Sequence, residues 1–298
     1  MTMLETTRIA LSTGVTLNVQ SGGARGGEAI IFLHGFPESH RTWRELLPDL
    51  ARDHFVVAPD QRGFAGSDKP EGVENYRPDR TVADLIALAD ALQIDRFTLV
   101  GHDWGGAIAW AAALKHPGRV ARLVILNAPH PLIFQKSLID DPAQRAASQY
   151  MRAFRNPAME QGIAAMGLAT FFDKTFGGHT DLAAIPPAER QAYLDQWGQP
   201  GALTAMFNWY RASEILVPEV GEEVAAPAWT SAPFPHLKMP VLVIWGLRDK
   251  ALLPVQLAGL NDVIDDLRIV TVEDAGHFVP WEKPEPVLAA IRDFLAEA

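Results

Sequence analysis

Short apolar runs rich in β-branched residues recur along the chain, at residues 29–33, 54–58, 96–100, 121–126, 241–245 and 267–272. Continuous apolar runs of this kind are typical of strands that are buried on both faces of a mostly parallel sheet. The amphipathic stretches between them predict crossover helices around 43–51, 82–92, 105–115 and 284–295. The alternation therefore predicts a doubly wound α/β sheet, and residues 7–12 and 15–19 predict an antiparallel hairpin at its edge that turns at Gly14.

The alternation stops after residue 127 and resumes only at Pro240. The stretch in between is rich in Ala, Met, Phe and Trp and contains no run that is typical of a strand. We therefore expect a helical cap, residues 131–235, inserted into a core domain of residues 1–130 and 236–298. Three prolines near its end predict a semi-rigid linker back to the sheet: Pro227, Pro233 and Pro235.

Composition narrows the class of protein. The formal net charge is -10, from 36 acidic and 26 basic residues, and no run of Lys or Arg could follow a phosphate backbone, so nucleic acid is not expected as a partner. The absence of cysteine excludes disulfides, thiolate nucleophiles and Cys-ligated zinc. Residues 1–11 lack the apolar stretch of a signal peptide, and no run reaches about 18 consecutive apolar residues, so we expect a cytoplasmic protein that binds no membrane.

One motif has the form of a nucleophile turn. Gly101-His102-Asp103-Trp104-Gly105 directly follows a predicted strand and opens a predicted helix. Glycines at both ends relieve crowding in a sharp turn that lifts the middle side chain above the sheet, and here that side chain is an aspartate. An isolated motif of this kind is more often structural, so the prediction that Asp103 is a nucleophile depends on partners elsewhere in the chain.

Two partners follow in the order that such a nucleophile requires, an acid and then a histidine. Asp249 lies just beyond the predicted strand that ends at Trp245, and His277 comes after the last predicted strand. Each alone has an ordinary structural explanation, as a helix cap or a surface histidine. Together, at strand ends, they predict a triad in which Asp249 orients His277 through one ring nitrogen while the other faces Asp103.

A second turn, His34-Gly35-Phe36-Pro37, ends the strand at residues 29–33. We expect the backbone N–H groups of Phe36 and Trp104 to form an oxyanion hole for developing negative charge. The alternative is a simple connection between a strand and a helix. A tight turn of this character is also compatible with a cis bond before Pro37, which the sequence does not decide.

Together these motifs resemble those of epoxide hydrolases of the α/β-hydrolase fold, a group closely related to haloalkane and fluoroacetate dehalogenases. The resemblance covers nearly the whole chain and includes, in the expected order, 34–37, 60–63, 66–70, 101–106, the Asp249 loop and Gly276-His277. It implies an α/β-hydrolase core with an inserted helical cap. It also implies that Asp103 opens a small-molecule epoxide to form a covalent ester and that His277 then activates water, giving a vicinal diol without a metal or an organic cofactor. The protein would be a monomer or a homodimer.

The same resemblance implies two cap tyrosines that hydrogen-bond the epoxide oxygen. Of the four tyrosines, Tyr210 lies in Asn208-Trp209-Tyr210-Arg211, which is similar to one family segment, and Tyr150 lies in a segment similar to the other. Packing or surface roles are expected for the other two, Tyr76 and Tyr193. The expected substrate contacts are Phe36, Pro37, Trp104 and Trp209.

Comparison within this group leaves two alternatives open. Fluoroacetate dehalogenases carry arginines one and four places after the nucleophile, where this chain has Trp104 and Ala107, so a clamp for a small carboxylate is missing. A haloalkane dehalogenase is compatible with Trp104 but less so with Phe36, where that group usually has Asn. A ligand-binding protein without catalytic activity is the other alternative, which an intact set of Asp103, His277 and Asp249 disfavours.

Overall fold

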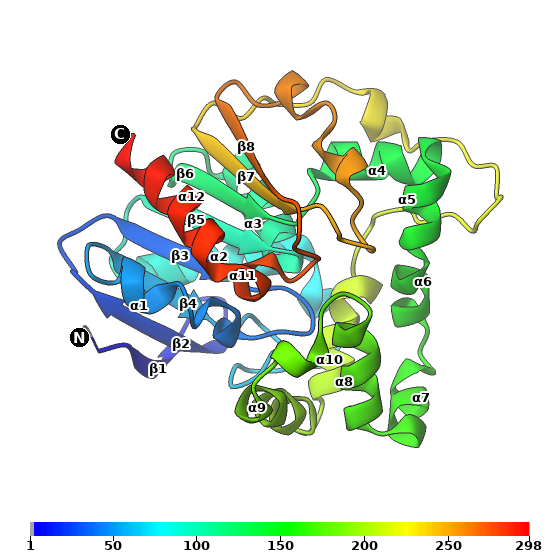
Figure 1. Ribbon diagram of the computed structural model, residues 1–298, viewed down its shortest axis with the longest axis horizontal. Coiled ribbons are helices and arrows are strands. Elements are labelled where there is room, and N and C mark those ends of the chain that lie inside the picture. Colours follow the sequence, from blue (N-terminus) through cyan, green and yellow to red (C-terminus); the bar gives the residue numbers. More distant parts are fainter. Residues whose placement is uncertain (1–2, 298) are drawn as a thin grey trace.

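The computed structural model describes residues 3–297 and contains one mixed sheet (Figure 1). The strands lie in the order β1-β2-β4-β3-β5-β6-β7-β8, with β1 and β2 antiparallel to their neighbours and all other pairs parallel. Their bounds are β1 Glu5–Ala10, β2 Thr16–Gly23, β3 Ala29–Leu33, β4 Phe55–Pro59, β5 Phe97–His102, β6 Val120–Leu126, β7 Val241–Gly246 and β8 Leu267–Val272. The predicted parallel sheet and the hairpin at its edge are confirmed.

Helices cover both faces of the sheet, as the unbroken apolar runs require. Neighbouring residues of β3 belong to different cores. Ile31 packs in the cluster under α2 (Pro78–Ala91) and α3 (Trp104–Lys115), and Ile30 packs in the cluster under α1 (Leu47–Leu50) and α12 (Pro284–Ala296). In Figure 1 the helices at the blue and red ends of the chain, α1 and α12, lie on the same face. The helices are α1 Leu47–Leu50, α2 Pro78–Ala91, α3 Trp104–Lys115, α11 Val279–Glu282 and α12 Pro284–Ala296.

One predicted helix is broken. The stretch 43–51 forms the end of a 3-10 helix, His40–Trp43, followed by the single turn of α1. Pro48 explains the break, because a proline lacks the N–H that a continuing helix needs and is tolerated only in the first turn. The other predicted crossover helices correspond to α2, α3 and α12.

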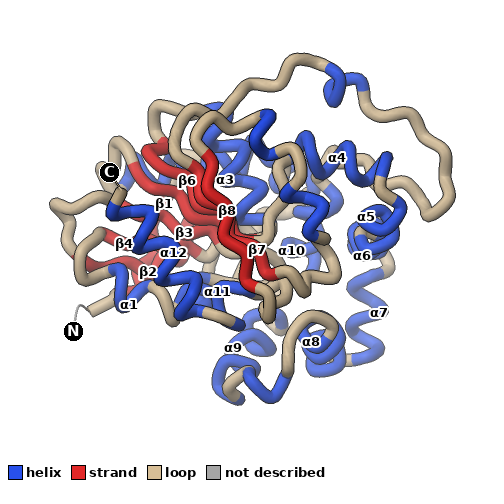
Figure 2. Tube along the Cα trace, turned by 45° about the horizontal axis from the view of Figure 1, so that its top comes forward, coloured by secondary structure: helices blue, strands red, loops and turns tan. Residues whose placement is uncertain are grey.

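The stretch between β6 and β7 contains no strand among its described residues and is built from helices, as predicted. Figure 2 shows these helices gathered at one end of the sheet, beyond the ends of its parallel strands. They are α4 Pro131–Asp140, α5 Pro142–Ala147, α6 Gln149–Arg155, α7 Met159–Met166, α8 Leu168–Gly177, α9 Pro187–Trp197 and α10 Ala202–Arg211. The chain then returns through an irregular segment with one 3-10 turn, Ala228–Ser231. The limits 131 and 235 of a cap domain stay a prediction.

The parallel strands all end at this side of the sheet, and the segments that follow them meet there. Phe36 follows β3, Asp103 follows β5, Asn127 follows β6, Asp249 follows β7 and His277 follows β8. Crevices at the carboxyl ends of parallel strands are the usual ligand sites of such sheets. Within residues 3–297, none of the helices has the length and hydrophobicity that a membrane crossing demands.

Candidate active site

Asp103 lies at the turn between β5 and α3 with a strained backbone, at φ 49° and ψ -121°. A positive φ is unfavourable for a residue with a Cβ and is found where the surrounding structure enforces it. The flanking glycines make the turn possible. A Cβ on Gly105 would lie 2.0 Å from the carbonyl oxygen of Leu33, and one on Gly101 would lie 2.5 Å from that of Gly105. Only glycine fits at either position, which explains the spacing in the motif.

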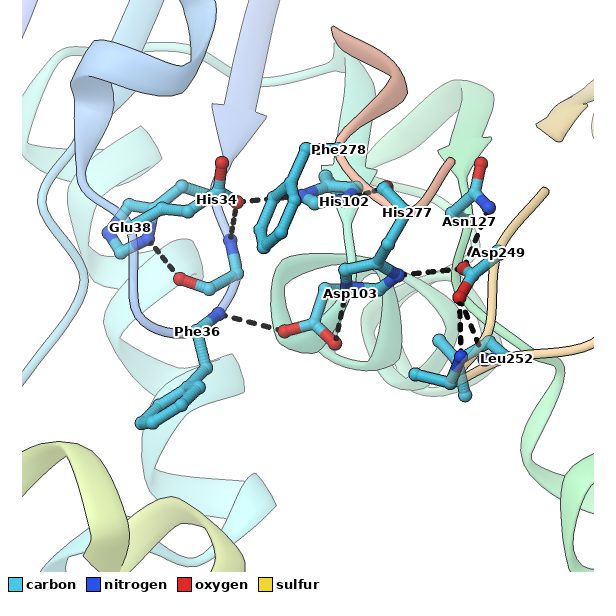
Figure 3. A network of polar contacts seen from close by, with 12 residues as sticks. His34, Phe36, Glu38, His102, Asp103, Asn127, Asp249, Leu252, His277 and Phe278 are labelled. Atoms are coloured by element: carbon cyan, nitrogen blue, oxygen red, sulfur yellow. Dashed lines mark hydrogen bonds and ion pairs between the residues drawn. The ribbon is translucent and has the colours of Figure 1, made fainter. Parts of the chain in front are cut away.

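His277 lies between the two aspartates (Figure 3). Its Nδ1 is 2.7 Å from Oδ2 of Asp249, and its Nε2 is 3.5 Å from Oδ2 of Asp103. All three side chains are at least nine-tenths buried. The structure therefore brings the three predicted residues together, with one ring nitrogen for each carboxylate.

Asp249 is held by several donors besides His277. Its Oδ1 accepts hydrogen bonds from the backbone N–H groups of Ala251 at 2.8 Å and Leu252 at 2.9 Å, and its Oδ2 accepts one from Nδ2 of Asn127 at 2.8 Å. Burial acts to raise the pKa of Asp249, but His277 and these donors outweigh it and lower the pKa. Asp249 is therefore a fixed carboxylate that orients the imidazole.

The protonation of His277 depends on both of its neighbours. Burial acts to lower its pKa, but the charges of Asp249 and Asp103 outweigh burial and raise the pKa of His277 well above its usual value. Removing the charge of Asp103 by ester formation would take away one of these two causes. His277 would then give up its proton more easily, as a general base requires.

The turn after β3 places a donor on the nucleophile. The backbone N–H of Phe36 donates to Oδ1 of Asp103 at 2.8 Å, and the Phe36–Pro37 bond is cis. A Cβ on Gly35 would lie 2.4 Å from Cβ of Asp103, so only glycine allows this approach. The N–H of Trp104 is the first in α3 and has no partner within its own helix. The backbone N–H groups of Phe36 and Trp104 are the two that were predicted from the sequence to form an oxyanion hole.

The two nominated tyrosines come from different cap helices and meet above Asp103. Tyr150 is on α6 and Tyr210 is on α10, with ring centroids 6.1 Å apart. The Tyr210 ring also packs edge-on against Phe36 and Trp104, both at 5.1 Å. Burial, followed by the charge of Asp103, raises the pKa of each hydroxyl well above its usual value, so both stay protonated as donors.

The site opens into two cavities of about 520 and 380 Å³. Asp103, Tyr150 and Tyr210 line both of them, Phe36 lines the larger and Trp104 lines the smaller. The other two predicted substrate contacts, Pro37 and Trp209, are not among the residues that line these two cavities. The carbonyl of Pro37 accepts a hydrogen bond from the Trp197 indole at 2.8 Å, and the Trp209 indole donates to the carbonyl of Arg62 at 3.0 Å. Direct substrate contact by Pro37 or Trp209 stays a prediction.

The remaining tyrosines lie outside the lining of these two cavities. Tyr76 is buried and donates from its hydroxyl to the carbonyl of Pro70 at 2.7 Å. Tyr193 is buried among cap aromatics, including Phe176 and Trp197. Both therefore pack, as expected. Across residues 3–297, no cluster of three or more His, Asp or Glu side chains has the arrangement of a metal site.

A buried pair beneath the site was not predicted from the sequence. Nδ1 of His102 is 2.7 Å from Oε2 of Glu38, and its Nε2 is 2.8 Å from the backbone carbonyl of His277. Burial acts to raise the pKa of Glu38, but the charge and hydrogen bond of His102 outweigh it and lower that pKa to about 2. Glu38 also accepts from the N–H of Gly35 at 3.3 Å. The pair thus joins the loop that carries His277 to the turn that carries Phe36.

Gln144, on α5 of the cap, was also not predicted from the sequence. Its side-chain amide donates to the carbonyl of Ala251 at 2.8 Å and accepts from the N–H of Leu253 at 2.9 Å. It also donates to the hydroxyl of Ser148, next to the start of α6. A fully buried glutamine therefore ties the helix before Tyr150 to the loop whose N–H groups hold the triad acid. Gln144 belongs to no recognised sequence motif, so its role can be seen only in the folded structure.

The family of the chain follows from its similarity to known proteins. The sequence model of the alpha/beta hydrolase fold family matches residues 28–284, and the chain belongs to this family. The fold and family that the motifs indicated are thereby confirmed. The chain is 32% identical over 285 residues to an AB hydrolase superfamily protein of Bacillus subtilis, with 95% of this chain and 96% of the relative covered.

Several relatives have more specific names. The chain is 31% identical to epoxide hydrolase A of Mycobacterium tuberculosis, with 97% of each chain covered. Among solved structures, it is similar to an epoxide hydrolase of the same superfamily from metagenomes of hot environments, at 47% identity and a TM-score of 0.92, covering 99% of this chain and 100% of that one. It is also similar to the epoxide hydrolase of Bacillus megaterium, at 29% identity and a TM-score of 0.83, covering 98% and 100%.

Proposed function

We propose that the protein hydrolyses a small-molecule epoxide to a vicinal diol through an ester on Asp103. The observation that carries the proposal is a carboxylate at the nucleophile turn, with the hydroxyl-bearing side chains of Tyr150 and Tyr210 lining the same two cavities. The names of the relatives support the same reaction. Water is the second substrate, and the state of assembly, monomer or homodimer, stays a prediction.

In the first step the two oxygens of Asp103 have different tasks. Oδ1 is held by the N–H of Phe36, so Oδ2 is the oxygen free to attack an epoxide carbon. The new carbon–Oδ2 bond forms as the epoxide carbon–oxygen bond breaks, and the electron pair goes to the epoxide oxygen. That oxygen takes a proton from Tyr150 or Tyr210, because an alkoxide is a poor leaving group without one.

In the second step His277 takes a proton from water, and the water oxygen adds to the carboxyl carbon of Asp103. The negative charge on Oδ1 is stabilised by the N–H groups of Phe36 and Trp104. The bond between that carbon and Oδ2 then breaks, and the proton still on the added water oxygen passes to Oδ2. The diol therefore leaves with Oδ2, and Asp103 keeps the water oxygen as part of its carboxylate. The proton on His277 restores the hydroxyl of the tyrosine that gave one up.

The second step explains why the nucleophile is an aspartate rather than a serine. Attack by a serine on an epoxide carbon would leave an ether, which has no carbonyl for water to attack. An aspartate leaves an ester, whose carbonyl oxygen already lies at the Phe36 N–H. A haloalkane would form the same ester at Asp103, but a halide leaves as a stable anion and has no use for two protonated tyrosines.

One experiment tests the reaction and the intermediate together. Excess enzyme is mixed with an aryl or alkyl epoxide in water labelled with heavy oxygen. The diol and the peptide that contains Asp103 are analysed by mass spectrometry after one turnover. We expect unlabelled diol and a labelled peptide containing Asp103. Label in the diol would mean that water attacks the epoxide directly, and no diol from any epoxide of a small panel would contradict the proposed function.

A further inference from the structure

The cap helix that carries Tyr150 binds the helix that carries Tyr210 through one arginine. Arg155 is the last residue of α6, and its Nε donates to the backbone carbonyl of Tyr210, near the end of α10, at 3.0 Å. Its Nη2 donates to the carbonyl of Ile215 at 2.8 Å and to that of Ser213 at 3.4 Å. One side chain on the helix of the first tyrosine therefore holds the backbone of the second.

The arginine meets α10 at the end where a helix lacks hydrogen-bond partners. Carbonyls of the last helical turn have no partner within the helix, and the C-terminal end of a helix attracts positive charge. The N–H of Ser213 also donates to the Tyr210 carbonyl, at 3.3 Å, so the guanidinium makes the shorter contact. Burial and the neighbouring Arg152 lower the pKa of Arg155, but a guanidinium stays protonated in proteins. Arg155 therefore acts as a charged cap on the end of α10.

The shape of the guanidinium matters as well as its charge. Its Nε and Nη2 are donors in one rigid plane, and here they reach carbonyls on either side of Arg211, the last residue of α10. Phe154, the residue before Arg155, packs its ring 5.0 Å from the ring of Tyr210, centroid to centroid. The end of α6 thus holds Tyr210 both by its ring and by its backbone.

Arg155 has no direct access to a bound substrate. It is not among the residues that line the two cavities at Asp103, whereas Tyr150 and Tyr210 line both. An effect of Arg155 on the reaction must therefore pass through the tyrosines. Since both hydroxyls serve the epoxide oxygen in the ring-opening step, the position of α10 relative to α6 decides whether both reach it. Misplacement of a catalytic group by about 1 Å can cost about 10²-fold in rate.

We propose that Arg155 is a positioning residue for the ring-opening step, which fixes the end of α10 against α6 so that the hydroxyls of Tyr150 and Tyr210 reach the same epoxide oxygen. The proposal rests on the epoxide hydrolysis proposed above. It separates the two chemical steps, because ring opening uses the tyrosines and ester hydrolysis uses His277. Loss of Arg155 should therefore slow formation of the ester on Asp103 and leave its hydrolysis nearly unchanged.

The test measures both steps in Arg155→Met, which keeps a long side chain and removes every donor. Enzyme is mixed rapidly with styrene oxide or, if another epoxide of the panel reacts faster, with that one. Mass spectrometry of the intact protein follows the ester as it forms and disappears. We expect ester formation to slow about ten-fold or more and ester hydrolysis to stay near the wild-type rate. Should Arg155→Met fail to fold, Arg155→Lys replaces it, and the same selective slowing is expected because a lysine keeps the charge but has no planar fork for two carbonyls.

A neighbouring arginine provides the matched control. Arg152 is on the same helix and is also half-buried, but it binds the chain beyond α10, through the carbonyl of Val217 at 3.0 Å and the carboxylate of Glu219. Arg152→Met removes the same donor groups without touching Tyr210. Both chemical steps should keep their wild-type rates in Arg152→Met, measured well below the melting temperature of each variant.

A second comparison uses Tyr210→Phe, which keeps the backbone carbonyl and lacks the proton donor. Because Arg155 is proposed to act by placing that donor, Arg155→Met should slow ester formation much less in the Tyr210→Phe background than in the wild type. Full slowing in both backgrounds, equal slowing in Arg152→Met, or equal slowing of both chemical steps would overturn the proposal. Absence of both ester and diol when the wild type is given every epoxide of the panel would instead count against epoxide hydrolysis.

Discussion

The contact between Gly35 and Asp103 offers a sharp test of the proposed oxyanion hole. In Gly35→Ala the added Cβ would lie 2.4 Å from Cβ of Asp103 and 2.5 Å from its Oδ1. Carbon atoms in contact stay about 3.5 Å apart, so the turn and the aspartate must separate by about 1 Å. Asp103 is fixed by its strained turn, and we therefore expect the turn that carries Phe36 to move.

The expected loss of activity in Gly35→Ala follows from the hydrogen bond between the Phe36 N–H and Asp103. The N–H of Phe36 is 2.8 Å from Oδ1, and a further separation of about 1 Å takes it beyond the hydrogen-bonding range of about 3.2 Å. Loss of one oxyanion-hole donor typically lowers kcat by about 10²–10³-fold, or about 3–4 kcal/mol. Since charge develops on Oδ1 when water attacks the ester, the hydrolysis step should slow more than the alkylation step.

Rapid mixing of enzyme with epoxide, followed by mass spectrometry of the intact protein, separates the two steps. The ester should accumulate to a larger fraction of the enzyme in Gly35→Ala than in the wild type. Gly118→Ala is a suitable control, because a Cβ at Gly118 meets nothing within 4 Å. If Gly35→Ala melts at the wild-type temperature and turns over epoxide within about three-fold of the wild-type rate, the Phe36 N–H is not an oxyanion donor and the reasoning is refuted.

Further predictions concern the base His277, the two tyrosines that act as proton donors, and Gln144. In His277→Gln the ester should form and persist, and an unmodified peptide containing Asp103 would contradict the two-step scheme. In the wild type, hydrolysis of the ester should slow as pH falls through the pKa of His277, and a flat profile in stopped-flow experiments would remove the histidine as base. Tyr150→Phe with Tyr210→Phe should lose about 10²-fold or more of epoxide opening but still release bromide if any bromoalkane reacts. Gln144→Met should lower stability by about 1–3 kcal/mol and slow ester hydrolysis more than ester formation; equal slowing would assign it a structural role alone.

The sequence predicted the strands and turns correctly wherever a position accepts only one type of residue. Apolar runs predicted the parallel strands because burial on both faces tolerates little else, and the pair Gly101 and Gly105 predicted the turn because any Cβ would clash there. The order of Asp249 and His277 after their strands was also readable, since parallel strands end on the same side of the sheet. The break at Pro48 could have been read from the chain as well, because proline there interrupts the predicted helix.

Contacts between distant polar residues could not be predicted in this way. His102 lies in one recognised motif and Glu38 directly follows the other, yet neither motif indicates that the carboxylate and the imidazole meet although they are 64 residues apart in the chain. Asn127 follows β6 like an ordinary turn residue. Its role in holding Asp249 arises from its positive φ of 38° and from the approach of β7 to β6, which only the folded sheet defines.

The position of these missed residues has a consequence for catalysis. Asn127 holds the triad acid from the end of β6, Gln144 holds its loop from the cap, and His102 holds the backbone of His277 from beneath. The imidazole must remain near Oδ2 of Asp103 before alkylation and must face water afterwards, while its charged neighbour disappears. Once the ester forms, the attraction between His277 and Asp103 is lost, and the ring stays in place only because groups other than Asp103 fix it. These supports should therefore matter more to ester hydrolysis than to ester formation.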